Sequence, residues 1–213
     1  MSFLGEYGVV LARKWIAGTR MEDGIRASKE LNALGESVLL NDLGEGLADR
    51  AMVEQAAGEY IRLIDMMKQS KIIGGISVKA TQLGMLVSDK ALYSNYGRIL
   101  RRAAEKKVFI WLDMEEYEYV GRTISLYMKF IRKYPDTGIC LQSKLRRSFV
   151  DMKRIASGGG IIRIVKGAYK YNAGVSYTDA DTVTESYIRM MEYLFKHKAR
   201  FIQERHRHTK QYK

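Results

Sequence analysis

Residues 160–169 read GIIRIVKGAY, and this stretch decides the fold class. Its β-branched residues are typical of a strand that is buried on both faces, as in a parallel sheet. Arg163 interrupts the apolar run, and a buried arginine needs an anionic or polar partner. Lys166 and Gly167 follow where the strand would end, and Gly167 lets a ligand approach the backbone closely. Two interpretations of Arg163 stay open: a cation that binds a ligand, or one that neutralises a structural carboxylate.

Four earlier segments have the same apolar character, and each is followed by apolar residues at helical spacing. The expected strands cover residues 37–42, 72–79, 108–115, 138–142 and 161–165. Two of the expected helices begin at caps formed by Thr19 and Ser88. Apolar residues at helical spacing mark four more, within residues 53–67, 120–131, 145–156 and 183–194. Because parallel strands need crossover connections, this alternation predicts an α/β protein with helices covering a parallel sheet.

The architecture is either a doubly wound sheet or a (β/α)₈ barrel. No GxGxxG follows the first strand, which argues against a dinucleotide-binding Rossmann unit. Polar side chains instead follow strand after strand: Asn41, Asp42, Lys79, Asp113, Glu115, Gln142 and Lys166. In a barrel the carboxyl ends of the strands converge on one mouth, where the active site lies. The pattern therefore favours the barrel.

Composition narrows the function classes. The chain has 213 residues and no run of about 18 apolar residues, so we expect one globular core and no membrane span. The single Cys140 excludes an intramolecular disulfide and favours a cytoplasmic location. All three histidines lie at or after His197, so no metal site is expected. The net charge is +12, and residues 196–213 contribute seven Lys/Arg and one Glu, or half of it.

The ordered set WIAGTRMEDGIRASKELNALG, NDLGE, ISVKATQLG, WLDMEE, CLQSKLRRS and RIVKGAYK resembles the FAD-dependent proline dehydrogenase family. The likeness covers roughly residues 10–195. It implies a (β/α)₈ TIM barrel of the proline dehydrogenase type, of which about five to six βα units are present. The implied reaction is the oxidation of L-proline to Δ1-pyrroline-5-carboxylate, with FAD as cofactor and a quinone as electron acceptor. The implied location is cytoplasmic, with a peripheral position at the inner face of the membrane as an option.

The resemblance also implies roles for individual residues. Asp113 and Arg163 match catalytic residues, and Arg163 would lie beside the reactive nitrogen of the flavin. Lys79 and Tyr169 match residues that bind the substrate. The implied cofactor-binding residues are Met114, Gln142, Arg163, Val165, Lys166 and Gly167. A fixed cation and a hydrogen-bond donor would stabilise the charge that develops on the flavin during hydride transfer.

The chain departs from the family pattern after His197. The family continues through a sixth strand that ends in a Thr-His-Asp or Thr-His-Asn motif, and through a helix with an arginine pair. Here the sequence reads KARFIQERHRHTKQYK, and we expect a partial barrel domain over residues 1–198 and a basic divergent tail over 199–213. Strands without their barrel partners would leave inner residues uncovered, among them Leu39, Ile76 and Ile110 or its neighbours. A partner chain that completes the barrel is an expectation of this pattern.

Three functional hypotheses remain open. The first is a proline dehydrogenase, or an inactive or split-subunit fragment of one. The second is a Schiff-base aldolase-type barrel enzyme with Lys79 or Lys166 as nucleophile. The third is a non-enzymatic remnant whose basic tail binds nucleic acid or anionic lipid through charge alone, although no nucleic-acid partner is expected from the family resemblance.

Overall fold

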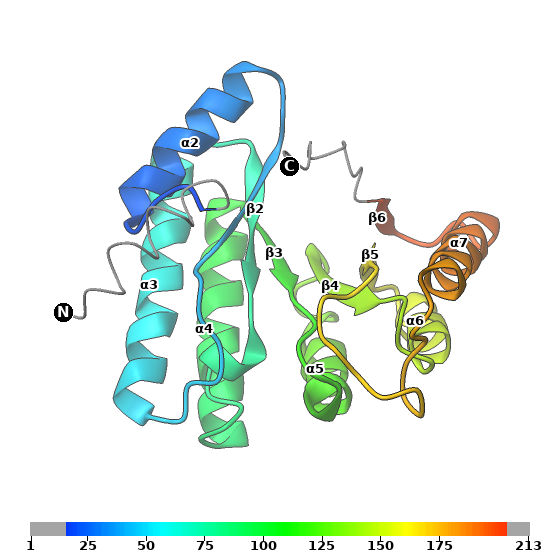
Figure 1. Cartoon of the computed structure of the whole chain (residues 1–213). Helices are drawn as coiled ribbons and strands as arrows, with labels where there is room; N and C mark the ends of the chain where they lie inside the picture. The colour runs from blue at the N-terminus through cyan, green and yellow to red at the C-terminus, as the bar shows by residue number, and fades with distance from the viewer. Residues whose placement is uncertain (1–15, 204–213) are drawn as a thin grey trace, which may run out of the picture.

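The computed structural model describes residues 16–203 (Figure 1). The strands are β1 (Val38–Asn41), β2 (Gly74–Val78), β3 (Phe109–Leu112), β4 (Thr137–Gln142), β5 (Ile161–Val165) and β6 (Phe201–Gln203). The helices are α2 (Met21–Ala33), α3 (Arg50–Gln69), α4 (Asp89–Lys106), α5 (Tyr117–Phe130), α6 (Ser148–Ser157) and α7 (Ala180–Lys196), and a 3₁₀ turn, η1 (Ala80–Gln82), follows β2. The predicted alternation of strand and helix is confirmed.

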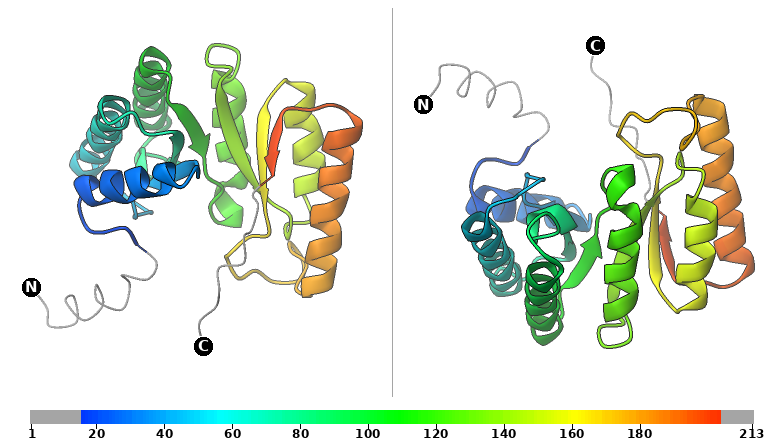
Figure 2. Two further views of the ribbon diagram at one scale, coloured as in Figure 1. Left: turned by 90° about the horizontal axis from the view of Figure 1, so that it is seen from above. Right: turned by 90° about the horizontal axis from the view of Figure 1, so that it is seen from below.

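All six strands lie in one sheet in the order β1-β2-β3-β4-β5-β6, and every neighbouring pair is parallel. A doubly wound sheet would reverse its strand order partway. This sheet keeps the chain order throughout, as the wall of a (β/α)₈ barrel does. Seen along the sheet, the strands curve and the helices lie on the outside of the curve (Figure 2). The prediction of a partial barrel is therefore confirmed.

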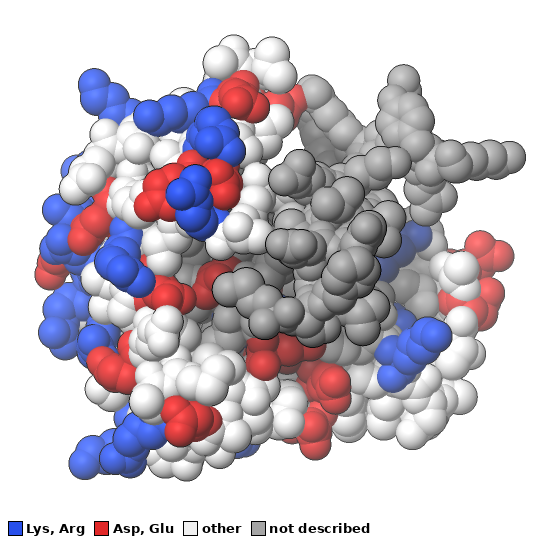
Figure 3. Space-filling view, turned by 60° about the vertical axis from the view of Figure 1, so that its left-hand side comes forward, with Lys and Arg blue, Asp and Glu red and all other residues white. Residues whose placement is uncertain are grey.

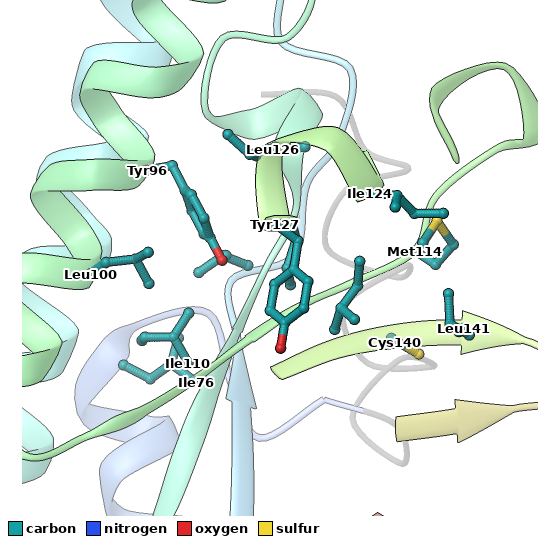
Figure 4. Close-up of a cluster of buried hydrophobic side chains, with 14 of the residues drawn as sticks. Ile76, Tyr96, Leu100, Ile110, Met114, Ile124, Leu126, Tyr127, Cys140 and Leu141 are labelled. Atoms are coloured by element: carbon teal, nitrogen blue, oxygen red, sulfur yellow. The ribbon is translucent and has the colours of Figure 1, made fainter. Parts of the chain in front are cut away.

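The hydrophobic core lies between the strands and the helices. The strand side chains that point into it are at most 1% exposed: Ile76, Val78, Ile110, Leu112, Ile139, Leu141, Ile162 and Ile164. Figure 4 shows Ile76 and Ile110 beside Leu100 of α4. The expectation that Ile76 faces the barrel interior is wrong, because the alternation of the strand turns it toward the helices. Of Ile110 and its neighbours, Ile110 also faces the helices, and Trp111 lies on the inner face in register with Gly138. Leu39 does lie on the inner face, in register with Gly75.

The helix starts follow local capping chemistry. Ser88 caps α4 as predicted, since its Oγ accepts a hydrogen bond from the amide of Ala91 at 3.1 Å. The predicted Thr19 cap is wrong by one residue. Arg20 is the N-cap of α2, because the carboxylate of Asp23 accepts a hydrogen bond from the amide of Arg20 at 3.3 Å.

The sheet continues past the expected end of the barrel domain. Residues 201–203 form β6, which pairs with β5 from Ile162↔Phe201 to Ile164↔Gln203. The expected basic tail therefore begins with a short strand, and the domain boundary after residue 198 stays a prediction. Residues 204–213, which include His206 and His208, lie outside the described residues.

Candidate active site

The predicted site residues meet at the carboxyl edge of the sheet. The chain leaves β1, β2, β3 and β4 at this edge with Asn41, Lys79, Asp113 and Gln142. Because the strands are parallel and adjacent, these residues lie in successive positions along one rim. The site is called the mouth below.

Asp113 and Arg163 form an ion pair at the centre of the mouth. The distance from Arg163 Nη2 to Asp113 Oδ1 is 2.5 Å, and the two side chains are only 10% and 16% exposed. Asn41 Nδ2 lies 3.4 Å from the other carboxylate oxygen of Asp113. Both interpretations of Arg163 thus meet in one contact, because its partner is a carboxylate that is itself a predicted catalytic group.

Trp111 supports this pair from the inner face of the sheet. The guanidinium of Arg163 lies 5.4 Å from the centre of the Trp111 ring, within range of a cation–π interaction. The ring extends over β4, where a Cβ on Gly138 would lie 2.2 Å from ring carbon Cζ3. Glycine at position 138 therefore makes room for the indole that holds Arg163 in place.

Lys79 and Tyr169 share one partner, the carboxylate of Glu45. Lys79 Nζ lies 3.0 Å from Glu45 Oε2, and the hydroxyl of Tyr169 donates to the same oxygen at 2.9 Å. The hydrogen bonds from Lys79 and then Tyr169 lower the pKa of Glu45. Burial, followed by the bond to Glu45, raises the pKa of the Tyr169 hydroxyl. The two predicted substrate-binding residues are therefore brought together around a carboxylate.

Gln142 is the last residue of β4 and is only 2% exposed. Its Nε2 donates to the main-chain oxygens of Met114 at 3.3 Å and Glu115 at 2.9 Å. Its Oε1 is buried and has no hydrogen-bond partner among the described residues. Such an orphaned acceptor is costly in a folded protein and indicates a site for a ligand donor.

Gly167 opens space next to that acceptor. Its backbone has φ +105°, and a Cβ at this position would lie 2.7 Å from Gln142 Oε1 and 2.7 Å from Lys144 Cδ. Any other residue would be strained and would fill the space beside the free oxygen. The residue type and the backbone angle thus agree with the predicted role in binding a cofactor.

The other residues predicted to bind the cofactor differ in which of their groups face the mouth. Met114 is 7% exposed and belongs to the hydrophobic core, so it offers its main chain rather than its side chain. Val165 is in register with Gln142 and is half-buried on the same face of the sheet. Lys166 is exposed, and its Nζ lies 2.9 Å from Thr184 Oγ1 on α7. The side chain of Lys166 is therefore directed to the outer helix.

The structure adds three residues for which no role was expected: Glu45, Lys144 and Tyr171. Glu45 lies in the quoted segment NDLGE, so its motif was visible but its partners were not. Lys144 Nζ donates to the main-chain oxygen of Tyr169 at 2.7 Å and lies against the space beside Gly167. The ring of Tyr171 lies 6.2 Å from that of Tyr169. These contacts fix the loop after β5 over the mouth.

Several other site classes find no support in residues 16–203. This part of the chain has no group of three or more His, Cys, Asp and Glu residues that could hold a metal ion. None of its helices combines the length and the apolar composition that a membrane crossing requires. On the face shown in Figure 3, Lys and Arg lie among Asp and Glu.

The chain is similar to known proteins over most of its length. The family model described as proline dehydrogenase matches residues 25–202. The chain is 30% identical over 178 residues to proline dehydrogenase 1 of Bacillus subtilis subsp. natto, covering 83% of this chain and 59% of that protein. It is 31% identical over 186 residues to the proline dehydrogenase of Deinococcus radiodurans, covering 85% and 60%. The chain thus spans about three fifths of the length of these relatives.

Solved structures agree on the fold. A crystal structure of proline utilization A (PutA) from Bdellovibrio bacteriovorus, inactivated by N-propargylglycine, superposes with a TM-score of 0.85 at 20% identity, covering 94% of this chain and 26% of that one. A PutA variant from Bradyrhizobium japonicum superposes with a TM-score of 0.72 at 16% identity, covering 87% and 23%. With the family model matching most of the chain, the protein belongs to the proline dehydrogenase family.

Proposed function

We propose that this chain carries the L-proline- and FAD-binding residues of an enzyme that oxidises L-proline to Δ1-pyrroline-5-carboxylate. The observation that carries the proposal is the convergence of Lys79, the Asp113–Arg163 pair and Gln142 on one rim of the sheet. These groups supply a cation for a carboxylate, a fixed charge pair and an unpaired acceptor, which is the set that a flavin and an amino acid require.

FAD fits the inner part of the mouth. The free Oε1 of Gln142 can accept a hydrogen bond from a ring N–H, and Gly167 leaves room for a ring edge beside it. Arg163 provides positive charge close to the same place, and Asp113 holds it there. When bound, FAD would supply a two-electron acceptor for the hydride that leaves the carbon next to the proline nitrogen. Gln142, Arg163, Val165, Gly167 and the main chains of Met114 and Lys166 would hold it.

L-Proline fits the outer part. The ammonium of Lys79 has three donors and uses one on Glu45, so it can also meet the substrate carboxylate. Tyr169 provides an aromatic wall while its hydroxyl stays on Glu45. Asp113 already contacts Arg163 and Asn41, which favours a role in orienting Arg163 over direct contact with the amine. The C=N bond of the product forms as the ring carbon loses hydride and the nitrogen loses its proton.

A quinone is the proposed electron acceptor. A quinone held in a bilayer would bring the enzyme to the inner, cytoplasmic face of the membrane. The Schiff-base alternative is weaker, because Lys79 lies in an ion pair and Lys166 is exposed.

The test is a proline-dependent dye-reduction assay on the purified chain with FAD supplied, alongside titrations with FAD and NAD. We expect FAD to bind more tightly than NAD, and L-proline to reduce the dye where D-proline does not. N-Propargylglycine should abolish this reduction. A second arm adds a segment that covers the rest of a relative's length, and turnover should rise in its presence. Tight NAD binding without flavin affinity, or no proline oxidation in either arm, would refute the proposal.

A further inference from the structure

Below the mouth lies a buried carboxylate, Glu115, that has no role in the chemistry described so far. Glu115 is 2% exposed and lies directly after Met114, in the segment between β3 and α5. Both of its oxygens bind the same residue. Oε1 accepts a hydrogen bond from the amide of Thr81 at 3.0 Å, and Oε2 accepts one from the Thr81 hydroxyl.

Thr81 connects this carboxylate to the substrate side of the mouth. It lies in η1, two residues after Lys79, so its position sets where the chain turns at the end of β2. Its hydroxyl oxygen also accepts a hydrogen bond from the amide of Gly46 at 2.9 Å. Gly46 directly follows Glu45, the partner of Lys79. The Glu115 carboxylate therefore fixes, through Thr81, both members of the Lys79–Glu45 pair.

The main chain of Glu115 connects to the cofactor side. Its carbonyl accepts hydrogen bonds from Gln142 Nε2 at 2.9 Å and from the Tyr171 hydroxyl at 3.3 Å. One residue thus bonds to the strand end that carries Lys79 and to the glutamine that faces the cofactor space.

Burying a carboxylate to hold a turn costs free energy, because the charged group loses its hydration. Burial raises the pKa of Glu115, and the two bonds from Thr81 and the charge of Lys79 act against that rise. A neutral side chain of similar shape would avoid the cost of desolvating a charge. An ionised carboxylate, however, accepts on both oxygens and gives the shortest and most directional bonds to Thr81.

We propose that Glu115 is a positioning residue that fixes Lys79 relative to Gln142, so that a substrate held by the lysine faces a cofactor held by the glutamine. It acts through Thr81 on one side and through its own carbonyl on the other, and touches neither ligand. Its catalytic consequence rests on the proposed oxidation of L-proline.

The test compares Glu115→Gln, Thr81→Val and Thr81→Ser in the full chain. Glutamine has the size of glutamate but only one acceptor oxygen, so it cannot accept from both the amide and the hydroxyl of Thr81. Valine removes the Thr81 hydroxyl. Each variant should raise the KM for L-proline about tenfold, with a smaller change in kcat. Serine keeps the hydroxyl and should restore the KM to within about twofold of the unmodified chain. The double variant Glu115→Gln, Thr81→Val should be no worse than the more severe single variant, because both remove the same link.

Tyr127→Phe is the matched control. The Tyr127 hydroxyl is also buried, and it donates to the main-chain oxygen of Thr137 and accepts from the amide of Ile161, both at 2.9 Å. These contacts lie at the amino ends of β4 and β5, at the opposite edge of the sheet. The control should lose stability without a change in KM.

A second readout needs no activity. The acetylation rate of Lys79, followed by mass spectrometry, should rise severalfold in Glu115→Gln but not in Tyr127→Phe. If the chain oxidises proline and Glu115→Gln leaves the KM unchanged, the positioning role is refuted while the proposed function stands. If neither the unmodified chain nor any variant oxidises proline, with or without the added segment, the proposed function fails and the acetylation rates alone decide. A faster rate in Glu115→Gln then supports the positioning role, and equal rates refute it.

Discussion

The two faces of the sheet share the same strands but are stabilised differently: one by apolar packing, the other by ion pairs and hydrogen bonds. On the face toward the helices, residues such as Ile110 and Ile139 are completely buried in an apolar layer. On the inner face, Asp113 and Arg163 are bound to each other, and Gln142 keeps one buried oxygen free. Apolar packing depends mainly on volume, whereas the inner face depends on charge and on the placement of single atoms. Substitutions on the two faces should therefore fail in different ways.

The largest effect on stability is expected on the helix face. Ile110→Ala leaves a cavity in a layer that is 0% exposed, and it should lower the free energy of unfolding by about 2–5 kcal/mol. FAD affinity of the folded protein should stay within about twofold, because the site lies on the other face. Urea denaturation and flavin fluorescence titration measure the two quantities. Ile188→Ala on α7, where the residue is 50% exposed, is the control and should change stability by less than about 0.5 kcal/mol. A drop in FAD affinity as large as the drop in stability would break the distinction between the faces.

Arg163→Ala tests the inner face. It removes a fixed positive charge beside the cofactor space, and flavin reduction by L-proline should slow by on the order of a hundredfold. Stopped-flow absorbance of the flavin measures this rate, and thermal unfolding gives stability in parallel. The matched control is Arg154→Ala, at an exposed position in the last turn of α6. Should Arg163→Ala fail to fold while any folded fraction reduces flavin at the normal rate, Arg163 is structural.

Gly167→Ala separates backbone strain from loss of space. The added methyl group would collide with Gln142 Oε1 in addition to straining a backbone with φ +105°, and FAD affinity should fall about tenfold or more. Gly159→Ala is the control, since that glycine has φ +78° but no atom within 4 Å of the added carbon. It should cost stability and leave FAD affinity unchanged. Equal losses of affinity in both variants would mean that Gly167 serves the chain turn alone.

The smallest expected effect concerns two glutamates at the mouth whose pKa values move in opposite directions. Hydrogen bonds lower the pKa of Glu45, so its contribution to stability is present above the ordinary pKa and is lost as the pH falls through the lowered pKa. Burial raises the pKa of Glu115, so the folded protein holds a proton longer than the unfolded chain, and stability declines as the pH rises from the ordinary pKa to the raised pKa.

Chemical denaturation across pH 3–8 checks these signs. Relative to Glu45→Gln, the unmodified chain should lose stability on acidification. Relative to Glu115→Gln, it should gain stability over the acidic range. If both stability differences changed with pH in the same direction, the hydrogen bonds or the burial of one of the two glutamates would differ from those given above.

The sequence predicted the strands well and the contacts at the mouth only in part. The runs at 108–115 and 138–142 were recognised because their apolar residues must be buried on both faces. The inward direction of Ile76 was predicted wrongly, and the choice between Ile110 and its neighbours was left open, because a strand apolar on both faces carries no alternation that would set its orientation. The cap of α2 was misplaced by one residue, since Thr19 matched the capping pattern while Asp23 binds the amide of Arg20.

The sequence alone determined that the chain is a parallel α/β protein of the proline dehydrogenase family, because motif order and apolar spacing are properties of the chain in one dimension. The tertiary structure decided which side chains contact one another. Glu45 and Tyr169 are separated by 124 residues, and Arg163 and Asp113 by 50, so no local pattern could pair them. Strand order and register bring these groups to one rim, where the charged side chains form ion pairs and hydrogen bonds with the groups that lie beside them.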